Sequence, residues 1–96
     1  MNKDDIMFTD FDSNLVFAKH ISWCEINNEV FVFNELNGNI FLFKSAQREI
    51  WKLIDSSNTI LSIIGLAKNE YTINPEKAIE IIQKFHNKGL VEVVKI

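Results

Sequence analysis

Several residue types are scarce in this chain of 96 residues, and each scarcity excludes a class of protein. A single cysteine cannot form an internal disulfide, so we do not expect a disulfide-stapled secreted domain. No apolar run approaches the roughly 20 residues that span a bilayer, and the acidic N-terminus lacks a signal-peptide core. We therefore expect a cytoplasmic protein with no membrane partner.

Motifs that hold metals, phosphates or catalytic nucleophiles are also missing. The chain has no HExxH, CxxC, Gly-rich phosphate loop or acyl-transfer elbow, and no pair of carboxylates stands out as acid and base. Cys24 lies about 13 Å from His20 along an extended strand, too far to pair or chelate. We expect Cys24 to be a small buried hydrophobe. No enzymatic activity, metal or cofactor is expected.

The net charge of −3 comes entirely from the first 13 residues, which hold four aspartates and one lysine. The rest of the chain balances nine basic side chains against nine acidic ones. A neutral domain with an acidic arm has little long-range attraction for a polyanion, which argues against nucleic acid. We divide the chain into an N-terminal arm of undetermined order, residues 1–18, and a single domain, residues 19–96.

Apolar residues are plentiful, and their pattern before residue 44 is that of strands. Residues 21–26 alternate between two faces, and residues 29–35 are rich in β-branched and aromatic side chains. Asn37 and Gly38 can both adopt positive φ, as the central pair of a tight hairpin turn does, and an apolar run follows them. The pattern predicts a three-stranded antiparallel meander whose third strand is an edge.

After residue 44 the apolar residues recur at helical spacing in three segments. Ser45, Thr59 and Asn74 are the expected N-caps of these helices, and Gly89 is the expected left-handed stop of the third. Residues 91–96 then predict a short strand. The fold class is therefore α+β of the winged helix-turn-helix type: a three-stranded antiparallel meander, three helices and a short C-terminal strand.

The third helix has two flanks beside its core-facing stripe. Lys77 and Lys84 lie on one flank, where they could meet phosphates or remain solvated. Ile79, Gln83 and His86 lie on the other, which is partly apolar. Ile79 either widens the arc that faces the core or forms the wall of a groove beside an apolar edge strand, and both interpretations stay open. His86 is expected to be a partly buried surface histidine.

From about Ile21 to Val91 the order of these motifs resembles the PqqD-type RiPP recognition element, a family named for a pyrroloquinoline-quinone biosynthesis protein. The resemblance rests on the strand meander, the Ile50-Trp51 pair, Leu53, Thr59, Ile63 and the Gly89-Leu90 ending. It implies a small winged-helix domain without catalysis that binds the leader segment of a ribosomally synthesised precursor peptide. The domain would present the core segment to a modifying enzyme, often a radical-SAM protein, or to a leader protease.

The resemblance also implies a binding site. The leader would add as an extra strand to the third strand, and its side chains would enter the cleft between that strand and the third helix. The edge would then be Asn39, Ile40, Phe41, Leu42 and Phe43. The helical wall would be Ile79, Gln83 and His86, the flank we prefer for its apolar floor, or else Lys77 and Lys84.

Two alternatives to a leader-peptide binder remain. A winged-helix domain linked to DNA binding or transcription would place its third helix on a duplex, although Glu76 and Glu80 would repel the phosphate backbone. A homodimer would form if residues 39–43 paired with their own copy. That edge lacks the charge or proline that normally blunts open strands, so it suits either a guest peptide or a second chain.

Overall fold

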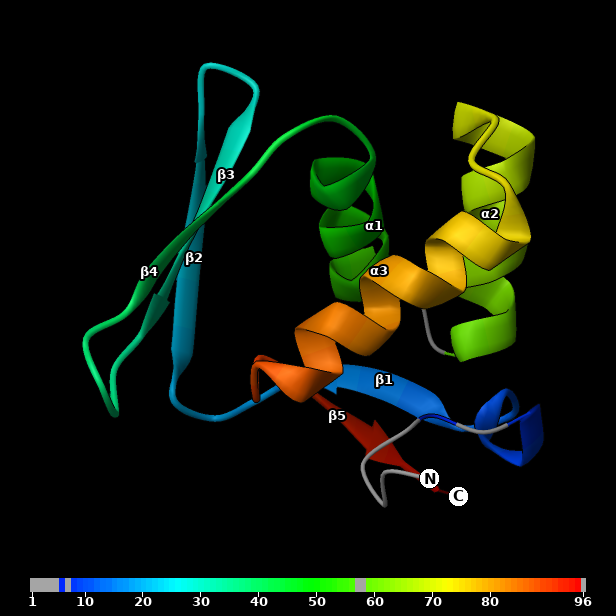
Figure 1. Ribbon diagram of the computed structural model, residues 1–96, viewed down its shortest axis with the longest axis horizontal. Coiled ribbons are helices and arrows are strands. Elements are labelled where there is room, and N and C mark those ends of the chain that lie inside the picture. Colours follow the sequence, from blue (N-terminus) through cyan, green and yellow to red (C-terminus); the bar gives the residue numbers. More distant parts are fainter. Residues whose placement is uncertain (1–5, 7, 57–58, 96) are drawn as a thin grey trace.

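The computed structural model describes residues 6, 8–56 and 59–95. Its elements follow in the order η1 (Phe8–Asp10), β1 (Asn14–Phe17), β2 (Ile21–Ile26), β3 (Glu29–Asn34), β4 (Ile40–Phe43), α1 (Ser45–Ser56), α2 (Ile60–Tyr71), α3 (Pro75–Asn87) and β5 (Val91–Val94). The strands β2, β3 and β4 stand beside the helices, α3 crosses in front of α1 and α2, and β1 and β5 lie beneath (Figure 1). The predicted α+β fold, with its antiparallel meander, three helices and C-terminal strand, is confirmed.

The meander has the strand order β2-β3-β4, so β2 and β4 are both edges of the sheet. Strands β2 and β3 are joined by Asn27 and Asn28, which adopt φ values of 52° and 65°. Positive φ at both central residues is what a two-residue hairpin turn of this kind requires. Asparagine tolerates this conformation better than other residues with a side chain do, which explains the choice of residues here.

The tight turn predicted at Asn37 and Gly38 is wrong, although a hairpin does form there. Of these two residues, Gly38 alone has positive φ, at 78°. The Gly38 N–H donates to the Asn34 carbonyl at 2.8 Å, and the Asn34 N–H donates to the Asn39 carbonyl at 2.9 Å. The connection from β3 to β4 is therefore wider than a two-residue turn, and Gly38 supplies the one left-handed residue that closes it.

The predicted caps of α2 and α3 are confirmed. Thr59 Oγ1 accepts a hydrogen bond from the Ser62 N–H at 3.0 Å, and Asn74 Oδ1 accepts from the N–H groups of Glu76 and Lys77 at 2.8 and 3.2 Å. These bonds satisfy backbone donors that have no partner within their own helix. The caps fix where each of these helices begins.

The end of α3 is as predicted, whereas the start of α1 differs. Gly89 has φ of 73°, and the Leu90 N–H returns to the Phe85 carbonyl at 3.1 Å, as in a Schellman motif. Ser45, predicted as the N-cap of α1, is instead its first residue and has φ of 53°. The Lys44 carbonyl accepts the first helical hydrogen bond, so Lys44 occupies the capping position.

Strands β1 and β5 form a second, two-stranded antiparallel sheet in which Asn14 lies opposite Val94. The sequence left the order of residues 1–18 open; residues 1–5 and 7 lie outside the described residues, and the rest of this segment folds onto the domain. The Ile60 N–H donates to the Ser13 carbonyl at 3.1 Å, and the Leu61 N–H donates to the Phe11 carbonyl at 3.0 Å. The segment therefore satisfies donors at the start of α2.

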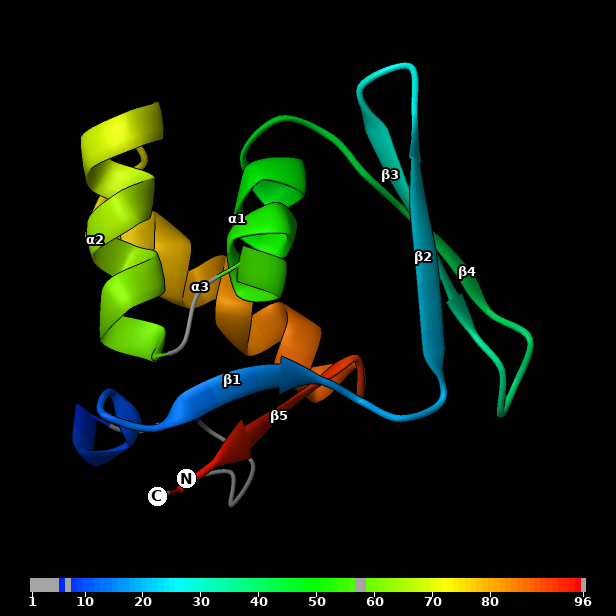
Figure 2. The same cartoon turned by 180° about the vertical axis from the view of Figure 1, so that it is seen from behind.

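The core lies between the meander and the helices, with Trp51 of α1 fully buried at its centre. The ring of Trp51 contacts Phe43 of β4, Phe85 of α3 and Phe17 of β1, with centroids 5.5, 5.2 and 4.5 Å apart. One aromatic cluster thus joins both sheets to two helices. Seen from both sides, all three helices lie on the same side of the meander (Figures 1 and 2).

Candidate functional site

Strand β4 has an open backbone edge. It pairs with β3 on one side, with Ile40 opposite Phe33 and Leu42 opposite Phe31. No strand among the described residues pairs with it on the other side. The bond from Asn34 N–H to the Asn39 carbonyl shows that Asn39 directs its carbonyl toward β3. Because this direction alternates along an antiparallel strand, the N–H and C=O groups of Ile40 and Leu42 point to the open edge.

The side chains of β4 divide between the two faces of the sheet. Phe43 is 4% exposed and packs against Phe85 of α3, with ring centroids 4.7 Å apart. Phe41 stacks on Phe43 at 6.2 Å and is half-buried. Ile40 and Leu42 face the other way and are 69% and 44% exposed. The strand is thus fastened to the helices through its phenylalanines, while its open edge and outward side chains stay accessible.

Lys77 and Lys84 lie on one flank of α3 and share an acidic partner. Both Nζ atoms lie 3.5 Å from Glu80 Oε1, and all three side chains are more than half exposed. Exposed ion pairs at these helical spacings contribute a few tenths of a kcal/mol, roughly, to helix stability. The pairing holds the two lysines weakly, so either side chain can exchange Glu80 for another anion.

Ile79, Gln83 and His86 lie on the opposite flank of α3. Ile79 is half-buried and packs against the core, which matches the interpretation that it widens the core-facing arc. Gln83 Oε1 accepts a hydrogen bond from the Ile6 backbone N–H at 2.6 Å, and Gln83 Nε2 donates to Asn87 Oδ1 at 2.8 Å. His86 is half-buried, as predicted, and its Nδ1 is buried without a hydrogen-bond partner among the described residues.

The site residues predicted from the sequence therefore form three groups, and the structure does not bring all three together in one place. Asn39 and the four residues of β4 follow one edge, while the two flanks of α3 face in different directions. In Figures 1 and 2, α3 passes between β4 on one side and the β1–β5 sheet on the other. The hydrogen bond between Ile6 and Gln83 places the Gln83 flank toward the N-terminal segment. The flank of Lys77 and Lys84 lies on the opposite side of α3 from this contact.

The described residues carry little that suggests chemistry. They hold no group of three or more His, Cys, Asp or Glu side chains placed to bind a metal ion. Within the same part of the chain, no helix has the length and apolar character needed to cross a bilayer. Cys24 is exposed, so the prediction of a buried cysteine is wrong. Its side chain lies on the face of β2 that is turned away from the helices, so the helices do not cover it.

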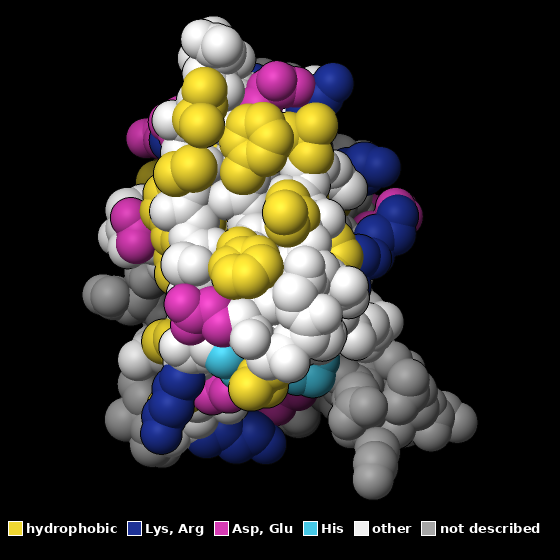
Figure 3. Space-filling view, turned by 90° about the vertical axis from the view of Figure 1, so that its left-hand side faces the viewer, with side chains coloured by type: hydrophobic (Ala, Val, Ile, Leu, Met, Phe, Trp, Pro, Cys, Tyr) yellow, Lys and Arg dark blue, Asp and Glu magenta, His cyan; other side chains and the backbone are white. Residues whose placement is uncertain are grey.

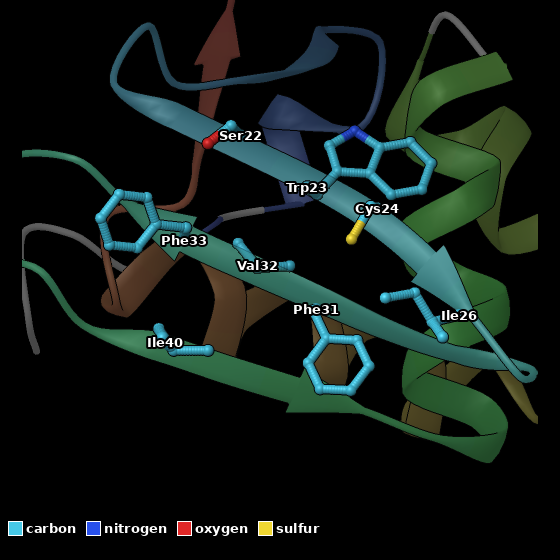
Figure 4. Close-up of a pocket in the computed structure, with 8 residues that line it drawn as sticks. All are labelled: Ser22, Trp23, Cys24, Ile26, Phe31, Val32, Phe33 and Ile40. Carbon is cyan, nitrogen blue, oxygen red and sulfur yellow. The ribbon is translucent and has the colours of Figure 1, made fainter.

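Besides the β4 edge, the structure has a second apolar surface that we did not predict from the sequence. We call it the outer face: the side of the meander away from the helices, formed by Ser22, Cys24 and Ile26 of β2, Phe31 and Phe33 of β3, and Ile40 and Leu42 of β4. Hydrophobic side chains gather over this face in Figure 3. Most of its residues line a shallow hollow of about 460 Å³ (Figure 4). Its signal was present in the sequence, because the residues on both faces of β3 and β4 are apolar.

No protein-family model matches the chain, and no curated protein matches it either. Among solved structures, the chain is similar to TbiB1 in complex with the TbiA(beta) leader peptide. The two chains superpose with a TM-score of 0.70 and 18% sequence identity, over 80% of this chain and 94% of that one. At this level of identity the likeness establishes a shared fold.

Proposed function

We propose that this chain binds the leader segment of a ribosomally synthesised precursor peptide as an extra strand on β4, and that it presents the rest of the peptide to a modifying enzyme. The observation that carries the proposal is the open edge of β4, which has no charge or proline between Asn39 and Phe43. The shared fold with TbiB1, a protein solved with a leader peptide, supports the same conclusion.

In this mode of binding, hydrogen bonds between the two backbones provide the affinity. The guest side chains at alternate positions provide the selectivity. The outward N–H and C=O groups of Ile40 and Leu42 would pair with the guest strand. Guest side chains on one face would then lie beside Phe41 and Phe43, toward α3. Those on the other face would lie beside the side chains of Ile40 and Leu42. A leader segment that is apolar at successive positions therefore fits this edge better than one with a polar face.

For the helical wall of the site, we now favour the flank of Lys77 and Lys84 over that of Ile79, Gln83 and His86. The Gln83 side chain is engaged by the backbone of Ile6, and Ile79 packs against the core. The lysines are exposed and share only Glu80 as an ion-pair partner among the described residues. An acidic leader residue could replace Glu80, which would speed association more than it strengthens the complex, and salt would weaken this effect.

The role needs a second protein, because binding a leader does not by itself change the peptide. We propose an enzyme that modifies the core segment, of the radical-SAM class, or a protease that removes the leader. The family resemblance supports both classes. The reading frames next to the gene distinguish them, since each class would be encoded beside a short precursor peptide.

The proposal is tested by titrating ¹⁵N-labelled protein with the leader of a precursor peptide encoded beside its gene. We expect amide shifts concentrated in residues 39–43 and in α3, with the largest changes at Ile40 and Leu42. Shifts confined to other elements would contradict the β4 site. Duplex DNA is the competing ligand for the alternative function. Binding to DNA that weakens steeply with added salt, together with no response to the leader, would favour that function instead.

A further inference from the structure

A cleft of about 370 Å³ lies between the start of α1 and the end of α2. Its lining residues are Ser45, Ala46, Arg48 and Glu49 of α1, Tyr71 of α2, and Ile73 in the connection to α3. In Figures 1 and 2, these ends of α1 and α2 lie side by side at the top of the molecule. Strand β4 ends before the cleft begins, so the proposed function leaves the cleft without a role.

The two walls of the proposed leader groove, β4 and α3, both lead to this cleft. Strand β4 ends at Phe43, and Ser45, two residues later, lines the cleft. Helix α3 begins at Pro75, and Ile73, two residues earlier, also lines it. Since Phe43 packs on Phe85 near the other end of α3, the strand and the helix run in opposite directions along the groove. The Phe43 end of the groove therefore opens on the cleft.

A guest strand has a short distance to cover beyond β4. Ser45 lies three residues after Leu42, and a strand advances about 3.3 Å per residue, so the cleft begins about 10 Å past the residue that pairs with Leu42. A guest that extends three or four residues beyond this pair covers that distance. On the premise of the proposed function, we propose that the cleft binds the stretch of the precursor peptide that continues past the Phe43 end of β4.

The charged groups of the cleft are already paired with each other. Arg48 Nε lies 2.6 Å from Glu49 Oε1, and these side chains are only 26% and 17% exposed. Arg48 Nη1 also donates to the Asn28 carbonyl at 2.5 Å, so the guanidinium is held at two points. A charged guest side chain would lose water beside an ion pair that is already balanced, and nothing would compensate that loss. The cleft therefore favours an uncharged stretch of peptide.

The remaining lining groups also suit an uncharged peptide. Ala46 and Ile73 provide apolar surface, and Tyr71, which is 43% exposed, adds its ring and its hydroxyl. Partial burial, the charge of Glu49 and a hydrogen bond to this carboxylate raise the pKa of the Tyr71 phenol. The hydroxyl thus donates to Glu49, while its oxygen can accept from a peptide N–H. The ligand that fits is a peptide segment with aliphatic or small uncharged side chains.

Two backbone positions beside the cleft have conformations that residues with a side chain rarely adopt. Ser45 has φ of 53° and Thr72 has φ of 57°. For a β-branched residue such as Thr72, this left-handed region is a clear outlier. Glycine adopts it without steric cost, yet neither position holds glycine. Strained positions of this kind gather at binding sites, which supports a ligand for this cleft.

The precursor peptide encoded beside the gene, shortened from each end in turn, tests the cleft by titration of ¹⁵N-labelled protein. We expect the intact peptide to shift the amides of Ala46, Tyr71 and Ile73 in addition to those of β4. Shortening from one end should remove the cleft shifts first and lower affinity at least about fivefold, while the β4 shifts persist. An intact peptide that shifts Ile40 and Leu42 but leaves the cleft amides unchanged would overturn the cleft as a subsite and leave the proposed function intact.

Tyr71→Ala tests the same cleft from the side of the protein. By calorimetric titration, we expect it to lower affinity for the intact peptide at least about threefold and to leave affinity for the shortened peptide unchanged. Leu61→Ala is the matched control, because Leu61 is an exposed apolar residue of the same helix that does not line the cleft. Guanidinium denaturation establishes that both variants are folded. Equal losses for the intact and the shortened peptide would overturn the role of the cleft.

Substitution within the peptide tests the ligand class and leaves the protein unaltered, so it decides even if Tyr71→Ala fails to fold. At the peptide position that reaches the cleft, Asp and Lys should each lower affinity more than Ala does. Equal affinities for all three peptides, or a preference for one charge, would overturn the uncharged ligand class. Absence of shifts at Ile40 and Leu42 with the intact peptide would instead overturn the proposed function, and the role of the cleft with it.

Discussion

The two edges of the meander share one partner strand, β3, but they differ in length, charge and anchoring. The β2 edge has six residues and includes Glu25, which forms an ion pair with Lys52 of α1. The β4 edge has four residues and no charge, and it is joined to α3 through the contact between Phe43 and Phe85. Among the described residues, the meander therefore has two open edges, and one of them is uncharged and lies next to α3.

The difference shows that an open edge does not by itself define a binding site. A charged residue within an edge strand discourages a second strand from pairing there. On β2 the two-residue turn makes Ile26 and Glu29 a hydrogen-bonded pair, so the backbone groups of Glu25 point to its open edge. A guest strand on β2 would therefore have to pair with the backbone of a residue that carries a carboxylate. On β4 the corresponding positions are Ile40 and Leu42, which leave the edge free.

The largest expected effect concerns how firmly each edge strand is attached to the helices. Phe43→Ala should reduce the free energy of unfolding by about 3–5 kcal/mol, because a nearly buried ring loses its contacts with Trp51 and Phe85. Trp23→Ala on β2 should reduce it by only about 1–2 kcal/mol, because Trp23 is half-buried. Guanidinium denaturation measures both values. Equal losses would show that the two edge strands are attached to the helices equally firmly.

The next effect concerns which edge binds the leader. Leu42→Pro removes an N–H that points to the open edge and leaves the ladder to β3 intact, as edge prolines do. We expect leader affinity to fall at least tenfold, or about 1.4 kcal/mol, with little change in the circular dichroism spectrum. Glu25→Pro is the matched control, since it removes an outward N–H from β2. If calorimetric titration shows that Glu25→Pro lowers affinity as much, the guest strand binds at β2.

The smallest effect concerns the charge that protects β2. Glu25→Val removes both the carboxylate and its ion pair with Lys52, and exposed pairs contribute about 0–1 kcal/mol. We expect unfolding free energy to change by less than about 1 kcal/mol, while light scattering detects aggregation at lower protein concentration than for the unaltered chain. Lys52→Met breaks the same ion pair and keeps the edge charge, so it should stay soluble. Similar aggregation of both variants would assign the protection to the ion pair.

Features set by neighbouring residues could be predicted from the sequence. Thr59, Asn74 and Gly89 act within one helical turn, so their residue types were enough to locate the ends of α2 and α3. The hairpin turns were harder, because Asn27-Asn28 and Asn37-Gly38 both tolerate positive φ. Which pair forms the two-residue turn depends on the strand register, and residue preference does not determine that register.

Features that depend on distant contacts could not be predicted. The hydrogen bond from Ile6 to Gln83 joins residues 77 apart in the chain, and it engages the flank of α3 that we predicted to form the wall of the binding site. Strand β1 pairs with β5, at the far end of the chain, and Asn14 to Phe17 show no alternation that predicts a strand. The exposure of Cys24 likewise depends on which face of the meander the helices cover. Which face the helices cover depends on the direction in which the chain passes from β4 into α1. Residue patterns do not show this direction.

The pairing of β1 with β5 has a consequence for how the domain can be joined to other proteins. Asn14 at the start of β1 lies directly opposite Val94 at the end of β5, and Asp10 Oδ1 lies 3.3 Å from Lys95 Nζ, so the N-terminal and C-terminal segments of the folded unit lie side by side. Figures 1 and 2 show these segments beneath α3, away from the β4 edge. The unit can therefore be inserted into a loop of a larger enzyme, or fused at either end, while β4 stays open. Domains with adjacent termini also tolerate circular permutation, and the turn at Asn27 and Asn28 is a suitable new opening.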